Sequence, residues 1–182
     1  MNPHTKCFSF ILVFAFFQCI VNGKKKILIK KFEMCDPNYD YPIALEGNFK
    51  ERNGHQFLNI TCIVNTPLGM NQSMNATFEY SENEESFTPL FKFSRSDLCD
   101  YFNKDLGKFW FELQQQIALA PRTCPIGNGR YNLKNYELPL SKLNFPLPTG
   151  FIRSILNVIE NETNKVILCV SVLLEVINLN TI

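Results

Sequence analysis

Along most of the chain, apolar and polar residues alternate with the two-residue period of β-strands that bury one face. The clearest case is segment 56–65, in which every second residue is apolar: Leu58, Ile60, Cys62 and Val64. We expect this set to face a core, and Asn59 and Thr61 to face outward. Similar patterns predict strands over residues 27–35, 43–50, 74–80, 87–93 and 166–178.

Two further extended segments are joined by a proline-spaced corner. Residues 131–136 alternate, with Tyr131, Leu133 and Asn135 on one face, and a second segment begins at Phe151. Between them, Pro139, Pro146 and Pro148 exclude a helix or a central strand, because proline lacks a backbone N–H.

One region, about 96–119, has helical spacing instead. Asp97 is a candidate N-cap, aromatic and aliphatic residues recur at three- and four-residue intervals on both sides of Gly107, and Pro121 follows the end. Residues 114–116 are glutamines, which we expect to lie partly on the solvent side.

Many short strands separated by turns predict an all-β fold, an antiparallel β-sandwich with a short helical insert. The chain has 182 residues and 46% hydrophobic residues, which suits one domain with a substantial core. A formal net charge of +1 removes the electrostatic case for a nucleic-acid partner.

The N-terminus has the pattern of a secretory signal. An uncharged apolar run over 7–21 is followed by small residues, which predicts a signal peptide over 1–23 and a single mature domain over 24–182. The run is too short to cross a bilayer comfortably, although Lys24, Lys25 and Lys26 directly after it are typical of a retained anchor. We expect cleavage and a mature chain without a transmembrane segment.

Glycosylation sequons and cysteines agree with an extracellular location. The four sequons begin at Asn59, Asn71, Asn75 and Asn161. Five cysteines remain after removal of the signal, namely Cys35, Cys62, Cys99, Cys124 and Cys169. In an oxidising compartment they are disulfide candidates, and an odd number leaves one thiol over; spacing alone does not choose the pairing.

Nothing in the chain favours catalysis or a bound metal. His55 is the one histidine of the mature chain, and it lies beside a turn signal where a solvated side chain is expected. The cluster of Glu82, Glu84 and Glu85 lies in an exposed acidic loop, where no burial would raise a carboxyl pKa. We therefore expect a protein that is not an enzyme and that has no cofactor and no metal site.

An ordered set of short motifs resembles a known family. In the second half these motifs are Cys124-Pro125, Gly129, Tyr131-Asn132-Leu133, the corner 147–150, Arg153 and Cys169. Upstream they are Pro89-Leu90-Phe91, Asp97-Leu98-Cys99 and an aromatic helix. Together they look like the group of MD-2-related lipid-recognition and GM2-activator-like proteins, and the upstream set looks like its insect branch of secreted proteins, some of them linked to pheromone and taste sensing.

The resemblance implies an immunoglobulin-like sandwich whose sheets splay to admit an apolar ligand between them. It also implies two disulfides, Cys35 with Cys169 and Cys99 with Cys124, which leaves Cys62 unpaired. This chain has fewer cysteines than the GM2 activator, and its first half does not match the ligand-contact loops of that protein. The resemblance therefore does not imply the glycolipid activity.

Aromatic residues gather around the helical region and the proline corner, and they are the candidate lining of such a cavity: Phe87, Phe91, Phe93, Phe102, Phe109, Trp110, Phe145 and Phe151. For each one alone, packing in a filled core is the plainer role. The expected function is a secreted, non-catalytic carrier of a hydrophobic small molecule or lipid. The alternative is a chemosensory accessory protein that acts through its surface, with a membrane receptor as a further partner.

Overall fold

The computed structural model describes residues 25–137 and 147–179, and it confirms the all-β antiparallel sandwich with a helical insert. The strands are β1 (Lys25–Met34), β2 (Ile43–Arg52), β3 (His55–Val64), β4 (Gln72–Ser81), β5 (Thr88–Arg95), β6 (Gly129–Glu137), β7 (Gly150–Glu160) and β8 (Val166–Asn178). The insert between β5 and β6 consists of α2 (Leu98–Asp100), the π-helix η2 (Tyr101–Leu106) and α3 (Lys108–Gln116). No helix in the described ranges is long and apolar enough to cross a membrane.

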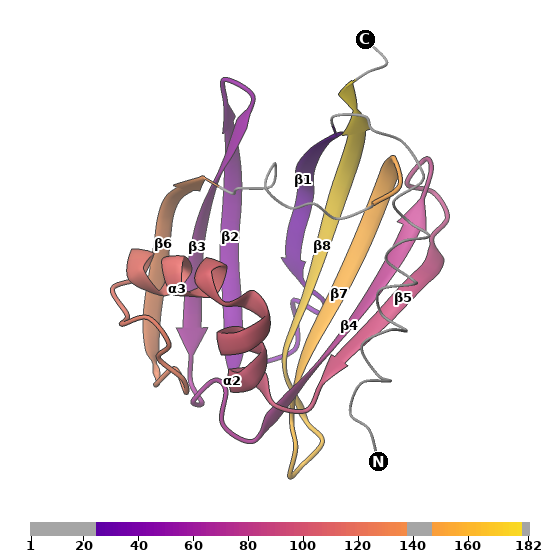
Figure 1. Ribbon diagram of the computed structural model, residues 1–182. Helices are drawn as coiled ribbons and strands as arrows, with labels where there is room; N and C mark the ends of the chain where they lie inside the picture. Colours follow the sequence, from indigo (N-terminus) through magenta and orange to yellow (C-terminus); the bar gives the residue numbers. More distant parts are fainter. Residues whose placement is uncertain (1–24, 138–146, 180–182) are drawn as a thin grey trace, which may run out of the picture.

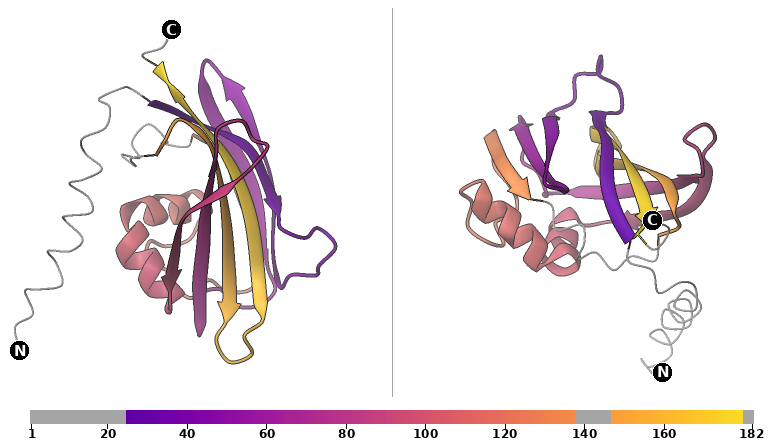
Figure 2. Two further views of the ribbon diagram at one scale, coloured as in Figure 1. Left: turned by 90° about the vertical axis from the view of Figure 1, so that its right-hand side faces the viewer. Right: turned by 90° about the horizontal axis from the view of Figure 1, so that it is seen from above.

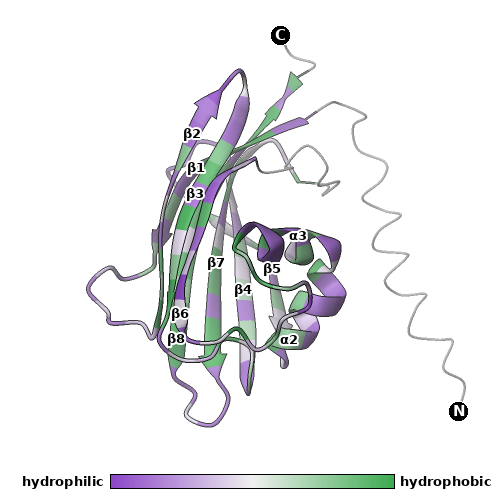
Figure 3. Ribbon diagram, turned by 90° about the vertical axis from the view of Figure 1, so that its left-hand side faces the viewer, coloured by the Kyte–Doolittle hydropathy of each residue, from purple (hydrophilic) through white to green (hydrophobic). Residues whose placement is uncertain are grey.

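The strands form two antiparallel sheets. The larger has the order β1-β8-β7-β4-β5 and the smaller the order β2-β3-β6. Figures 1 and 2 show the two sheets facing each other, with the helical insert lying over the space between them, where it contacts β6 and β4. Figure 3 shows hydrophobic residues recurring along the strands, as expected for sheets with one buried face.

The hairpin between β2 and β3 follows from its two turn residues. Asn53 and Gly54 both have positive φ angles, 52° and 78°, which suits the type I′ turn that matches the twist of a two-stranded ribbon. This turn sets the register from Arg52 opposite His55 to Ile43 opposite Val64. The predicted inward set of β3 is confirmed, because its members are buried or line the space between the sheets.

Strict alternation fails in β6, where the sequence pattern placed Asn135 on the face of Tyr131 and Leu133. The β3–β6 register shifts between Leu58 and Ile60, and Asn135 has a φ of 50°. Its backbone N–H donates to Asn59 Oδ1 at 3.0 Å, so Asn135 is exposed in a bulge. The bulge turns Tyr136, which is half-buried, onto the covered face in its place.

The two sheets contact each other along their β1 and β2 edges. Buried Gln56 on β3 accepts from the backbone N–H of Ile29 at 2.7 Å and donates to the Ile29 carbonyl at 3.0 Å. Because β1 is an edge strand that pairs only with β8, backbone groups on its other side are free to meet a side chain of the other sheet. The opposite edges, β5 and β6, are not paired with each other among the described residues, and this is the side that the insert covers.

Both disulfides that the family resemblance implied are present. Cys35 and Cys169 join the chain directly after β1 to β8, and Cys99 and Cys124 join α2 to the segment that leads into β6. Cys62 is unpaired among the described cysteines.

Candidate functional site

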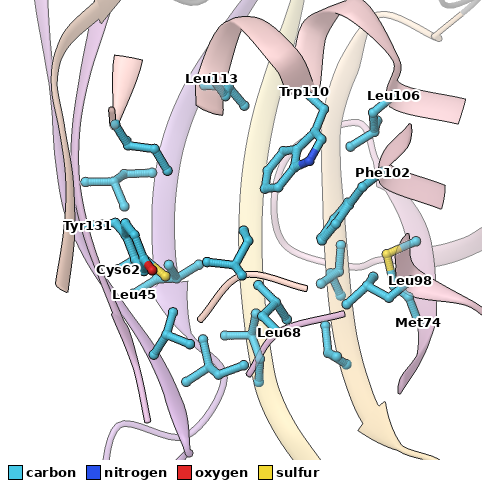
Figure 4. A pocket seen from close by; sticks show the side chains of 18 of the residues that line it. Leu45, Cys62, Leu68, Met74, Leu98, Phe102, Leu106, Trp110, Leu113 and Tyr131 are labelled. Carbon is cyan, nitrogen blue, oxygen red and sulfur yellow. The ribbon is translucent and has the colours of Figure 1, made fainter. Parts of the chain in front are cut away.

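The space between the sheets contains an apolar cavity of about 280 Å³. Strands of both sheets line it, as do the helical insert and the segments after β3 and before β6 (Figure 4). Its lining consists of Ile43, Leu45, Ile60, Cys62, Val64, Leu68, Met74, Leu98, Tyr101, Phe102, Leu106, Trp110, Leu113, Ile117, Ile126, Tyr131, Leu133, Leu156, Val158 and Leu168. None of these is acidic, basic or a histidine, so within the described chain the cavity offers no ion-pair partner.

The aromatic part of the lining belongs mainly to the insert. The rings of Phe102 on η2 and Trp110 on α3 stack with centroids 4.2 Å apart and planes 20° apart. Tyr101 adjoins Phe102 on one side and Phe93 of β5 on the other, with centroids 6.0 and 5.5 Å apart. This row of rings connects the insert to the edge of the larger sheet.

A short antiparallel bridge and a disulfide position the insert over the cavity. Leu68 and Ile126, both buried, exchange two backbone hydrogen bonds of 2.9 and 2.8 Å. Next to them, Gly69 has a φ of 119°, and a Cβ atom there would lie 2.7 Å from Cys99 Sγ and 2.5 Å from Cys124 Sγ. Glycine at position 69 therefore lets the chain pass against the disulfide.

Gln114 holds the end of the insert. Its side chain is fully buried, although the sequence pattern placed residues 114–116 partly on the solvent side. Its Nε2 donates to the Thr123 carbonyl at 2.6 Å, and its Oε1 accepts from the backbone N–H of Arg122 at 2.7 Å. These partners lie in the segment after α3. The hydrophobic periodicity of the helix therefore could not identify Gln114 as a buried residue.

Three polar groups in or near the lining are unusual. Burial raises the pKa of the Cys62 thiol to about 11, so the side chain is a neutral thiol at ordinary pH. Trp110 Nε1 and Asn103 Oδ1 are buried and have no hydrogen-bond partner among the described residues.

The predicted aromatic residues separate into two groups. Phe102 and Trp110 line the cavity, and Phe93 packs against the core beside them. Phe93 itself lies outside the lining, as do Phe87, Phe91, Phe109 and Phe151. Phe145 lies outside the described residues.

Register and ion pairing explain two of these exceptions. Phe91 pairs with Phe78, farther from the insert than the pair of Phe93 and Ala76, and its side chain is 49% exposed. The Phe87 ring instead packs on the guanidinium of Arg153, 4.1 Å from the ring centroid, and that guanidinium binds Glu79 at 2.6 Å.

Most of the lining is aliphatic and comes from strand positions that aromatic counting does not find. Ile60, Cys62 and Val64 were nevertheless visible in the sequence as the apolar set of one strand. Leu156 and Val158 of β7 alternate in the same way. The signal was therefore the two-residue period, read together with the direction that each strand faces.

A family model described as "Protein of unknown function (DUF1091)" matches residues 74–154. No curated protein matches the chain. Among solved structures, the chain is similar to chicken MD-1 complexed with lipid IVa, with 12% identity, a TM-score of 0.38, and 88% of this chain and 94% of that chain covered.

Proposed function

We propose that this protein binds a hydrophobic small molecule or lipid in the cavity between its sheets and carries it without chemical change. The observation that supports this most directly is the cavity of about 280 Å³ with its almost wholly apolar lining. Sites for apolar ligands are concave and mostly hydrophobic, and contain few polar groups. A closely packed core would not leave such a space.

The same geometry argues against catalysis in this cavity. General acid–base or nucleophilic chemistry needs a titratable group near the reacting atoms. The ionisable lining residues are Cys62, Tyr101 and Tyr131, and burial raises the pKa of the first two, which keeps them protonated. His55 lies outside the cavity lining and is exposed, with Nδ1 2.7 Å from Glu137 Oε1.

We further propose that the mature chain is secreted and glycosylated. The sequon asparagines Asn71, Asn75 and Asn161 are exposed, and the structure contains two disulfides. Asn59 lies on the outer face of β3, where its Nδ2 donates to Asn48 Oδ1 at 3.3 Å. Disulfides of this kind persist in oxidising compartments.

One observation favours the second function, a module that acts on a membrane receptor or another partner through its surface. Leu90 and Phe91 on edge strand β5 are 41% and 49% exposed. An exposed apolar edge strand offers unpaired backbone groups with which another chain can pair. A chemosensory role of this kind is compatible with a bound ligand.

The test is native mass spectrometry of the full chain secreted from eukaryotic cells, before and after organic extraction. We expect an added mass that extraction removes and that is identified as an apolar compound. The Cys62→Phe variant, which adds bulk inside the cavity, should lose the added mass. Phe91→Ala, which changes a residue outside the lining, should keep it.

The opposite pattern would contradict ligand carriage. If the native protein and Phe91→Ala both show a mass explained by chain, glycans and disulfides alone, and neither takes up added lipid, the cavity is not a binding site. Loss of partner binding in Phe91→Ala alone would then support the surface function.

A further inference from the structure

One residue of the cavity lining, Trp110, has a buried indole N–H without a hydrogen-bond partner among the described residues. Trp110 is the only tryptophan in the chain, and Figure 4 shows its side chain reaching from α3 into the space between the sheets. Its Nε1 is buried and has no partner among the described residues. An indole nitrogen can only donate, and a buried indole N–H normally has an acceptor.

The lining does not provide that acceptor. Neither of its two tyrosine hydroxyls accepts from Nε1: the Tyr131 hydroxyl donates to the Gly127 carbonyl at 2.9 Å, and Tyr101 lies near Asp105 and Arg95. The thiol of Cys62 accepts hydrogen bonds only weakly. A buried water molecule needs two or more polar partners, and the lining residues beside the indole, such as Phe102 and Leu106, offer none. Asn103 Oδ1 is the other buried side-chain atom without a partner among the described residues, and Asn103 lies outside the lining.

The absence of charge limits what an occupant can be. No carboxylate, ammonium, guanidinium or imidazole group belongs to the lining described above. An ionised headgroup in this space would lose its hydration without gaining a counter-ion. The occupant is therefore uncharged where it lies inside the cavity.

Volume limits it further. A cavity of about 280 Å³ is at the low end of the range for small-molecule sites. This space suits one hydrocarbon chain rather than the several chains of a complex lipid.

We propose that the cavity takes an uncharged molecule with one hydrocarbon chain and one carbonyl oxygen, and that this oxygen accepts a hydrogen bond from Trp110 Nε1. Esters, ketones and aldehydes of moderate length have this chemistry. The inference rests on the proposed function and deepens it by naming the ligand class. Because Nε1 is buried, binding also requires neighbouring side chains to shift, and Phe102 and Leu106 lie beside the indole in Figure 4.

The test compares three probes of similar length, tetradecane, methyl dodecanoate and dodecanoate, by displacement of a fluorescent lipid from the full chain. In the native protein, the ester-to-alkane affinity ratio should be about tenfold higher than in Trp110→Phe, since one hydrogen bond separates the two proteins. Tetradecane itself should bind both proteins with similar affinity. Dodecanoate, ionised at pH 8, should bind the native protein at least about tenfold more weakly than its methyl ester.

Two controls accompany these affinities: the matched variant Phe102→Leu, and the indole N–H resonance of the unmodified protein. Phe102→Leu removes the adjacent ring, which has no hydrogen-bond donor. This variant should therefore alter the affinities for ester and alkane by the same factor. In the unmodified protein, the single indole N–H gives a single resonance, and the ester should shift it downfield whereas tetradecane should not.

Each outcome decides the question. An equal loss of ester and alkane binding in Trp110→Phe, with no downfield shift in the native protein, would make Trp110 a packing residue and overturn the proposal. Dodecanoate binding as tightly as the ester would overturn the uncharged ligand class. Alkane binding without preference for the ester leaves the carrier function standing, and failure of all three probes to bind overturns both.

Discussion

Alkylation of Cys62 is a chemical probe of the cavity, because its side chain belongs to the lining. Burial raises the pKa of its thiol from 9.0 to about 11, and only the thiolate reacts with alkylating agents. At pH 8 we therefore expect iodoacetamide to label Cys62 about 100-fold more slowly than an unshifted thiol, with a rate that increases as the pH rises toward 11.

The measurement is the rate of mass increase on intact, non-reduced protein. Cys62→Ala is the control and should show no labelling of the mature chain. Methyl dodecanoate should slow the reaction further, because the thiol lines the cavity in which we propose that it binds. Labelling of the folded protein at the rate of a free thiol would contradict the burial of Cys62.

Gln114 is a second residue whose effect the structure predicts. Replacing it with leucine leaves the Thr123 carbonyl and the Arg122 N–H without their side-chain partner. We expect Gln114→Leu to lower the free energy of unfolding by about 1–3 kcal/mol. The adjacent and exposed Gln115 is the matched control, and Gln115→Leu should change it by less than about 0.5 kcal/mol.

Urea unfolding followed by far-ultraviolet circular dichroism gives both values. Equal effects of the two substitutions would mean that Gln114 does not hold the segment after α3.

Among the elements, the helical insert depends on the disulfide at its two ends. Cys99 and Cys124 are 25 residues apart, and the bond between them restricts the unfolded chain. The double variant Cys99→Ala/Cys124→Ala should unfold with about 2–4 kcal/mol less free energy than the native protein. It should also bind ligand more weakly, because the insert supplies Phe102 and Trp110 to the cavity.

Denaturant unfolding and thiol titration test this prediction together. Cys62→Ala, which removes a cysteine without breaking a bond, controls for the substitution itself. Titration of four or five free thiols in the purified native protein would contradict both the disulfides and the secretory route.

The strands also show which features of the fold could be predicted from the sequence. A two-residue period is a local signal, and it identified the strands and the inward face of β3. It failed at Asn135, because a bulge held by Asn59 adds a residue to one strand only. It also could not separate Phe93 from Phe91, because both lie on one strand, and what distinguishes them is the contact of the Phe93 ring with Tyr101 of the insert.

The candidate site could likewise be predicted only in part from the sequence. Phe102 and Trp110 were among the candidate residues because aromatic residues gather around the helical region, and both line the apolar cavity. The aliphatic lining required knowledge of which strands face each other, and the unpartnered Trp110 Nε1 required three-dimensional contacts. The disulfide pairing came from the family resemblance, since five cysteines allow several pairings.

At the scale of the whole molecule, the sandwich is closed along one edge and covered along the other. Gln56 joins β3 to Ile29 on the closed side, whereas the insert lies over the opposite side. An apolar ligand bound between the sheets, as proposed, would therefore act as part of the core, and its removal would leave the lining with fewer contacts.

Stability should therefore depend on the ligand. A ligand that binds only the folded state adds about 2.7 kcal/mol when its concentration is 100 times its dissociation constant. We expect organic extraction to lower the urea midpoint of the secreted protein, and methyl dodecanoate to restore it. Cys62→Phe, with bulk already in the cavity, should have a midpoint that neither treatment changes. If extraction and ligand leave the native midpoint unchanged while circular dichroism shows the same fold, the space between the sheets does not hold a ligand that the folded state needs.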